Sequence, residues 1–140
     1  MIDCFDIRIE NKATATKLIA AIAETYNLQI DEVNLQYNDA FDYSVPKRRL
    51  LCIVMVEGDE PFQTMLTLDE FDCDTDIAIS KIASKISYNL GCDALIQSDI
   101  PYDDEAMLYI SGLKAPKLVL VYEERDEVSD CLHFKIEDYY

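Results

Sequence analysis

Apolar residues recur at two different periods along the first part of the chain. Phe5, Ile7 and Ile9 alternate with charged residues, and this period of two is typical of a β-strand with one buried face. Asn11 and Thr14 are both suitable N-caps for a helix. The residues that follow are spaced as on one face of a helix: Ala15, Leu18, Ile19, Ile22 and Tyr26. The pattern therefore predicts a strand and then a helix.

The next segments predict three strands and a turn. Residues 33–37 alternate again, whereas residues 50–56 are all apolar, which is typical of a strand covered on both faces at the centre of a sheet. Gly and Pro within residues 58–61 indicate a turn, and residues 62–68 are then expected as the antiparallel partner strand. Between the predicted strands 33–37 and 50–56 lies an acidic, turn-rich segment, residues 38–46, which we name the first acidic loop.

A second helix and four further strands are predicted in the rest of the chain. An apolar stripe marks the helix: Ile79, Ile82, Ala83, Ile86 and Leu90. Asp72, Asp74 and Asp76 are expected to favour its start through the helix dipole, and Gly91 is expected to end it. Residues 98–105 form the second acidic loop. The strands are expected over four segments, the third of them buried: 94–96, 107–110, 118–122 and 132–136.

These elements define one α+β domain over residues 1–140. We expect a mixed, mostly antiparallel sheet of about seven or eight strands with two helices packed on it. The order helix-strand-strand-strand occurs twice. The two helix stripes match with a shift of 64 positions, whereas Tyr26-Asn27-Leu28 recurs 62 positions later. The chain is therefore either a tandem duplication or two modules of similar architecture.

This order of elements resembles that of the glyoxalase and extradiol-dioxygenase superfamily. In that superfamily, duplicated βαβββ units place a His/Glu metal site in a curved sheet, so the resemblance would imply a metal-dependent enzyme. His133 is the only histidine of this chain, so the ligands of that superfamily cannot be placed here. We expect His133, which alternates with apolar residues in a predicted strand, to lie on the more exposed face of the sheet and to have a structural or surface role.

No motif for catalysis, metal binding or cofactor binding is found. Asp72, Asp74 and Asp76 match the first ligand positions of an EF-hand loop, but Ile77 stands where that loop needs Gly and Ala83 where it needs Glu. The sequence contains no glycine-rich phosphate-binding motif and no G-x-S-x-G. We therefore expect no enzyme, no metal site and no cofactor.

Composition favours a soluble protein of a reducing compartment. Half of the residues are hydrophobic, and only 3 Gly and 4 Pro are present, which excludes intrinsic disorder. The longest apolar run, residues 50–56, is far shorter than the roughly 20 residues that span a bilayer, and no signal-peptide pattern is present. The five cysteines form no C-x-x-C pair. We expect a cytoplasmic protein with reduced, structural thiols.

Acidic residues outnumber basic residues by 28 to 12, and the formal net charge is −16. Nucleic acids and anionic lipids are bound mainly through Lys and Arg, so we expect neither as a direct partner. Repulsion among so many like charges destabilises a small domain, which favours an anionic surface that has a function. A basic protein is the partner that such a surface attracts, because complementary charge raises the association rate.

The two acidic loops combine carboxylates with aromatic rings, and Tyr is a favoured anchor at protein interfaces. Both loops follow the first strand after a helix, so pseudo-symmetric modules would place them at related positions of the sheet. Solvated polar loops with incidental rings are the alternative. The predicted partner-binding residues are Tyr37, Asp39, Phe41, Asp42 and Tyr43 in and beside the first loop, and Tyr102, Asp103, Asp104 and Glu105 in the second.

Size, charge and loop composition together predict a small acidic cytoplasmic binding protein that neutralises a basic partner. In general character it is similar to bacterial immunity proteins, which favours a nuclease toxin domain as the partner and occlusion of the toxin's substrate-binding surface as the mode of inhibition. An acidic secretion chaperone that binds an effector is the alternative from another class. The sequence leaves the oligomeric state open.

Overall fold

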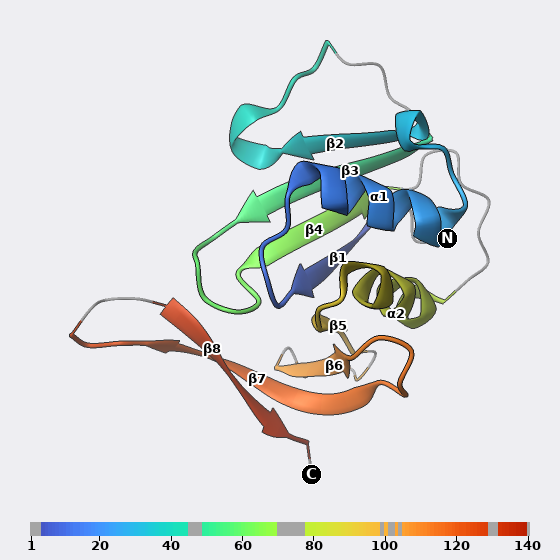
Figure 1. Ribbon diagram of the computed structural model, residues 1–140. Helices are drawn as coiled ribbons and strands as arrows, with labels where there is room; N and C mark the ends of the chain where they lie inside the picture. Colours follow the sequence, from blue (N-terminus) through green and yellow to red (C-terminus); the bar gives the residue numbers. More distant parts are fainter. Residues whose placement is uncertain are drawn as a thin grey trace.

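The computed structural model describes residues 4–44, 49–69, 78–98, 100, 103, 105–128 and 132–139. Two α-helices accompany eight strands that form a single sheet (Figure 1). The elements are β1 (Cys4–Ile9), α1 (Ala15–Tyr26), the 3-10 helix η1 (Ile30–Glu32), β2 (Val33–Tyr37), the 3-10 helix η2 (Asn38–Ala40), β3 (Leu50–Val56), β4 (Thr64–Asp69), α2 (Ile79–Leu90), β5 (Ala94–Gln97), β6 (Ala106–Ile110), β7 (Lys117–Arg125) and β8 (Leu132–Asp138). The predicted α+β fold is confirmed.

The strand order is β2-β3-β4-β1-β5-β6-β7-β8. β2 and β3 are parallel, and every other neighbouring pair is antiparallel, so the sheet is mixed and mostly antiparallel, as predicted. The middle of the sheet, β3-β4-β1-β5, has the strand order of a split β-α-β motif, in which α2 connects β4 to β5 across β1. β2 extends this motif at one edge, and β6, β7 and β8 extend it at the other.

Both helices pack side by side on one face of the sheet (Figure 1). α1 begins after Thr14, whose Oγ1 accepts a hydrogen bond from the Lys17 N–H at 3.3 Å, so the observed N-cap is one of the two that were predicted. The helix ends at Asn27, which adopts the left-handed conformation with φ 55°. Neither described helix is long and apolar enough to cross a membrane.

α2 has no acidic residue in its first turn. It begins at Ile79 after the extended residue Ala78, so the prediction that Asp72, Asp74 and Asp76 open this helix is wrong. These three aspartates lie outside the described residues. Gly91 ends the helix with φ 72°, as predicted, because a residue without Cβ adopts the left-handed conformation at little cost.

The main hydrophobic core lies between the two helices and the sheet. Its central side chains come from β1, β4, α1 and α2: Phe5, Ile7, Ile9, Leu66, Leu68, Leu18, Ile22, Ile82, Ala83 and Ile86. The alternation of β1 and both helix stripes are thus confirmed. Burial of each large apolar side chain stabilises the fold by about 1.5–3 kcal/mol, so this layer is the main source of stability.

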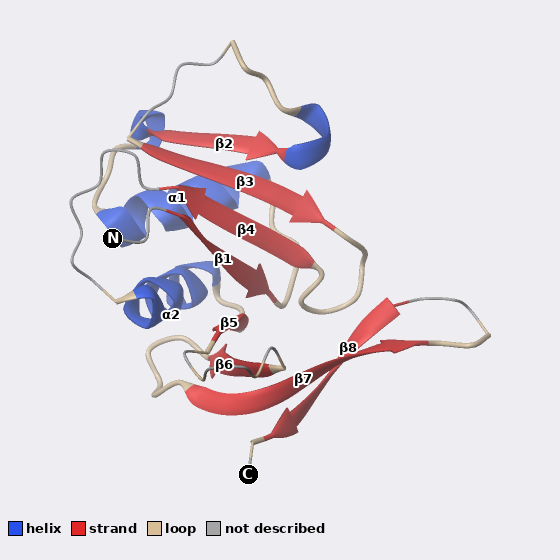
Figure 2. Cartoon of the chain, turned by 180° about the vertical axis from the view of Figure 1, so that it is seen from behind, coloured by secondary structure: helices blue, strands red, loops and turns tan. Residues whose placement is uncertain are grey.

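A second, smaller cluster lies on the opposite face of the sheet, where the long β7–β8 hairpin twists away from the other strands (Figure 2). Leu95 belongs to it, whereas its neighbours Ala94 and Ile96 face the main core. The predicted strand over residues 118–122 is confirmed as part of β7, but its expected burial is wrong, because Val119 is the one buried residue of that segment. The cluster consists of Phe62, Leu95 and Val119 with the half-buried Met107, Tyr109, Val121, Phe134 and Ile136.

The two halves of the chain differ in strand pairing. β2 and β3 are parallel, whereas their counterparts β5 and β6 are antiparallel. The helices do correspond, since each has 12 residues and is ended by a left-handed residue, Asn27 or Gly91, at a shift of 64 positions. The tripeptide match at a shift of 62 has no structural counterpart, because Asn89 lies within α2. The similarity therefore concerns the helices and not the sheet.

Candidate partner-binding surface

The described part of the first acidic loop, residues 38–44, stays attached to β2, the strand that precedes it. The Asp42 N–H donates a hydrogen bond to Oε1 of Gln36 at 3.0 Å. Gln36 is buried in β2, and its amide nitrogen donates to Oδ1 of the buried Asn34 at 2.8 Å. A pair of buried polar side chains therefore positions the loop, although no pattern in the sequence indicated this contact.

Asp42 is held as a carboxylate by its neighbour Ser44. Oδ1 of Asp42 accepts hydrogen bonds from the Ser44 hydroxyl at 2.6 Å and from the Ser44 N–H at 2.9 Å. Both hydrogen bonds favour the charged form, and they lower the pKa of the Asp42 carboxyl. The negative charge of this exposed side chain is thus fixed in position as well as in ionisation state.

Two aromatic rings of the same loop contact each other. The centroids of Phe41 and Tyr43 are 4.6 Å apart, with an angle of 50° between the ring planes. Phe41 is half-buried, whereas Tyr43 is 89% exposed. A large ring that is ordered by a neighbour and still exposed to solvent can anchor a protein interface at little entropic cost.

A hollow of about 170 Å³ adjoins the loop at the end of the parallel strands β2 and β3. We name it the Asp39 hollow; it is lined by Tyr37, Asn38 and Asp39 on one side and by Val54, Met55 and Val56 on the other. Tyr37 is half-buried and Asp39 is exposed. The sequence singled out Tyr37 and Asp39, but it missed the wall from β3, because the parallel pairing of β2 and β3 is a long-range feature.

The second acidic loop lies elsewhere in the molecule. Tyr102 and Asp104 are outside the described residues. Asp103 is half-buried, and its carboxylate accepts a hydrogen bond from the Glu105 N–H at 3.2 Å. Glu105 is exposed, and its carbonyl accepts from the Val121 N–H of β7 at 2.8 Å.

The structure does not bring the two acidic loops together. β2 and β1 run in the same direction, and β5 is antiparallel to β1. The first loop follows β2 and the second follows β5, so the loops leave the sheet at opposite ends and three strands separate β2 from β5. The first loop is the better candidate, because its neighbours hold Asp42 and Tyr43 in place and Asp39 borders a hollow.

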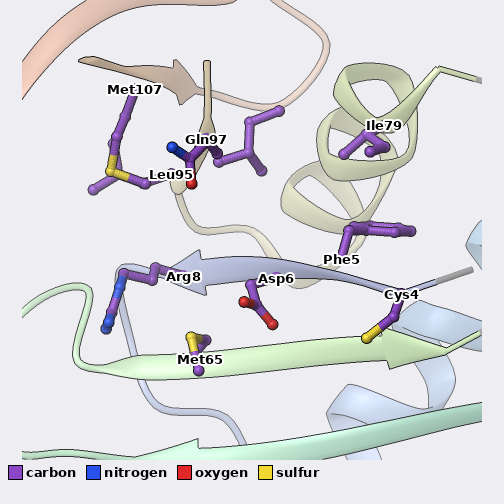
Figure 3. A pocket seen from close by; sticks show the side chains of 10 residues that line it. Cys4, Phe5, Asp6, Arg8, Met65, Ile79, Leu95, Gln97 and Met107 are labelled. Atoms are coloured by element: carbon purple, nitrogen blue, oxygen red, sulfur yellow. The ribbon is translucent and has the colours of Figure 1, made fainter. Parts of the chain in front are cut away.

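A larger cavity opens where the middle of the sheet splits (Figure 3). The described parts of β1 and β5 pair at two positions only, Arg8 opposite Leu95 and Ile9 opposite Ala94. Beyond these pairs the strands diverge around a cavity of about 440 Å³. Its lining is mostly apolar with four polar side chains: Phe5, Met65, Ile79, Leu95, Ile96 and Met107 with Cys4, Asp6, Arg8 and Gln97.

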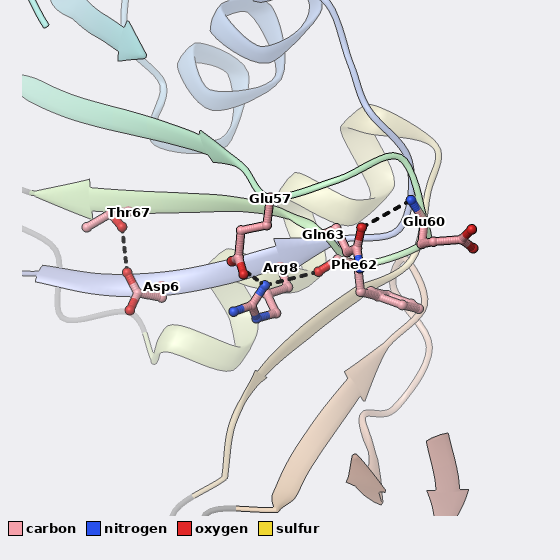
Figure 4. A network of polar contacts seen from close by, with 7 residues as sticks. All are labelled: Asp6, Arg8, Glu57, Glu60, Phe62, Gln63 and Thr67. Carbon is pink, nitrogen blue, oxygen red and sulfur yellow. Dashed lines mark hydrogen bonds and ion pairs between the residues drawn. The ribbon is translucent and has the colours of Figure 1, made fainter. Parts of the chain in front are cut away.

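The polar groups of this cavity are largely satisfied within the protein (Figure 4). Nη1 of Arg8 forms an ion pair with Oε1 of Glu57 at 2.8 Å and donates to the Phe62 carbonyl at 3.2 Å. The Arg8 guanidinium also lies 4.9 Å from the centroid of the Phe134 ring. The Thr67 hydroxyl donates to Asp6 at 2.6 Å. Arg8 therefore connects β8 to the centre of the sheet, which is a structural role.

The three described cysteines, Cys4, Cys52 and Cys92, are free thiols with a raised pKa. Desolvation and the carboxylates of Asp69 and Asp6 raise the pKa of the exposed Cys4 thiol, and burial raises the pKa of Cys52 to about 12, so both disfavour the nucleophilic thiolate. Nε2 of His133 lies 3.3 Å from Oε2 of Glu124 on the neighbouring strand. Within the described residues, no group of three or more His, Cys, Asp or Glu side chains could hold a metal ion.

Comparison with known proteins assigns no family: no family model matches this chain, and no curated protein or solved structure matches it. The split β-α-β strand order does not define a function by itself, because one fold supports many functions. The function therefore has to be argued from the loop, the hollow and the charge.

Proposed function

We propose that this protein binds a basic protein through the first acidic loop and the adjoining ends of β2 and β3. The observation that carries the proposal is the ordering of this loop: Asp42 is a fixed carboxylate beside the exposed ring of Tyr43. Preorganised groups lose little conformational freedom when they bind. An ordered anionic surface with an aromatic anchor is suited to a partner that presents Lys and Arg.

The net charge of −16 supports the same choice of partner. Long-range attraction steers a basic protein toward an acidic one and raises the association rate, and this effect weakens as salt is added. The same charge repels nucleic acids and anionic lipids. A protein that is itself basic because it binds phosphates is therefore the partner that this surface selects best.

The specific form that we propose is inhibition of a nuclease toxin. A nuclease binds its substrate through cationic groups that contact phosphates, and an inhibitor that presents carboxylates can occupy those groups. The first acidic loop would lie against the substrate-binding surface of the toxin, and the protein would act as an immunity protein in the same cytoplasm.

Inhibition of a captured partner tests this proposal. The tagged protein is used to isolate its partner from native cells, and the purified partner is assayed for nuclease activity with increasing amounts of the wild-type protein or of variants. Asp39→Lys with Asp42→Lys reverses two loop charges. Glu24→Lys with Glu127→Lys makes the same change of net charge at exposed sites elsewhere, in α1 and in the turn between β7 and β8, and serves as the matched control.

The proposal predicts that the wild-type and control proteins abolish nuclease activity at equimolar amounts and that the loop variant does not. Circular dichroism should show that all three proteins are folded, because exposed substitutions usually change stability by about 0.5 kcal/mol or less. A captured partner that is acidic, that lacks nuclease activity, or that is inhibited equally well by the loop variant would overturn the proposal.

A further inference from the structure

The Asp39 hollow has the lining that a long cationic side chain requires. We infer that it receives one arginine side chain of the partner; this inference rests on the proposed function and names the partner group that the first acidic loop recognises. The hollow measures about 170 Å³, comparable with an engineered cavity of about 150 Å³ that holds one benzene molecule. It therefore has room for one side chain and not for a loop or a helix.

The wall from β3 fits the aliphatic stem of such a side chain. Val54, Met55 and Val56 line the hollow consecutively. Val54 is 2% exposed and belongs to the main core, whereas Val56 is 46% exposed. An arginine stem that covers Val56 would remove apolar surface from water, since the methylenes of Arg commonly lie along apolar surface while the charged group stays accessible.

The opposite wall fits the charged end. Asp39 is exposed and forms no ion pair or hydrogen bond with any residue in the described part of the chain, so its carboxylate is available to a ligand. Tyr37, which packs half-buried against the main core, lines the hollow beside Asp39. A guanidinium can form a bidentate contact with a carboxylate and stack on an aromatic ring at the same time.

The carboxylate of Asp39 and the aromatic residue Tyr37 beside it favour arginine over lysine as the occupant. The ammonium of lysine is a compact, strongly hydrated charge that cannot form the bidentate contact, whereas the guanidinium is planar and more weakly hydrated. The charge of the hollow also excludes an anionic or purely apolar occupant, because Asp39 would then be covered without a counter-charge. An arginine is therefore the side chain that can cover the apolar surface of Val56 and pair with the carboxylate of Asp39 at the same time.

Amino-acid amides test this inference without the partner. N-acetyl-arginine amide, N-acetyl-lysine amide and N-acetyl-citrulline amide are titrated up to their solubility into the full chain, and the methyl resonances of Val54, Met55 and Val56 are followed by NMR. We expect saturable shifts at these methyl groups with the arginine probe, weaker binding of the lysine probe and no saturation with the uncharged citrulline probe.

Two variants locate the binding to the hollow. Asp39→Asn should weaken binding of the arginine probe about two- to fivefold, the range expected for the loss of one exposed ion pair. Val56→Trp should fill the hollow and abolish the chemical-shift changes of the remaining methyl groups. Glu127→Gln and Val128→Trp are the matched controls, since both residues are exposed in the turn between β7 and β8, and should change nothing. The inference is overturned by the absence of shifts, by binding of the lysine or citrulline probe that equals binding of the arginine probe, or by full binding of the arginine probe to Val56→Trp.

The outcomes separate this inference from the proposed function. If the loop variant fails to inhibit the partner but arginine and lysine probes bind alike, the proposed function stands and the arginine hollow is wrong. If the arginine probe binds in the hollow but the loop variant inhibits the partner as well as the wild type does, the hollow is an arginine-binding site and the proposed function is wrong.

Discussion

The hydroxyl and the N–H of Ser44 both donate to Asp42, so this neighbour stabilises one negative charge of the candidate site. Because the pKa of Asp42 is lowered in the folded protein, the hydrogen bonds from Ser44 stabilise the fold at pH values above the ordinary carboxyl pKa. This stabilisation is lost as the pH falls through the lowered pKa of the folded state. The hydrogen bonds between Ser44 and Asp42 therefore contribute to stability throughout the neutral range.

We predict that Ser44→Ala raises the pKa of Asp42 back toward its ordinary value of 3.8. The side-chain hydrogen bond is the larger cause of the lowered pKa, and the backbone hydrogen bond from residue 44 remains, so the return is partial. An NMR titration of the Asp42 carboxyl carbon measures it. An unchanged pKa in the variant would mean that the hydroxyl does not stabilise the carboxylate.

At the residue scale, the sequence revealed periodic burial better than it revealed polar contacts. Ile7 and Ile86 are buried as their spacing predicts, since periodicity reflects the face that packs. Phe62 was assigned to a strand because it is apolar, but it lies in the turn before β4 with φ 65°, a conformation that is rare for a bulky residue. The contact of Gln36 with Asp42 depends on tertiary structure and leaves no local pattern.

The β7–β8 hairpin is the element that the sequence described least well. A continuous apolar run predicted burial on both faces, yet β7 lies beyond the two helices, and only one of its faces contacts the second cluster. β7 also continues to Arg125 and β8 to Asp138, because charged residues on the exposed face extend a hairpin as readily as apolar ones. β7 is joined to the main body by its pairing with β6, and β8 contacts it through Phe134 and Arg8.

We predict that Phe134→Leu loosens this hairpin and leaves the rest of the fold intact. An Arg cation over a ring contributes about 0.5–1 kcal/mol at exposed sites, so amide hydrogen exchange in β7 and β8 should become at least about twofold faster, while exchange in β3 and β4 stays the same. Lys135→Met, on the other face of β8, is the control and should have a smaller effect. Equal protection of the hairpin amides from hydrogen exchange in Phe134→Leu and in the wild type would contradict the conclusion that Arg8 holds β8 through the Phe134 ring.

At the scale of the whole molecule, the sequence predicted the sheet and the charge but not the arrangement of the loops. The first and second acidic loops were expected at related positions, and the antiparallel pairing of β1 with β5 places them at opposite ends of the strands. Strand direction depends on crossover connections, which the spacing of apolar residues does not reveal. The Asp39 hollow was missed for the same reason, since half of its lining comes from β3.

The association rate with the basic partner tests the central claim most directly, because long-range attraction by a charge of −16 acts before any contact forms. Rates are measured by stopped flow over a range of salt concentrations for the wild type, for Asp39→Lys with Asp42→Lys, and for the control Glu24→Lys with Glu127→Lys. We expect fast association that slows steeply with salt, and a larger loss of rate in the loop variant than in the control. Association that is independent of salt, or that is affected equally by both pairs of substitutions, would contradict it.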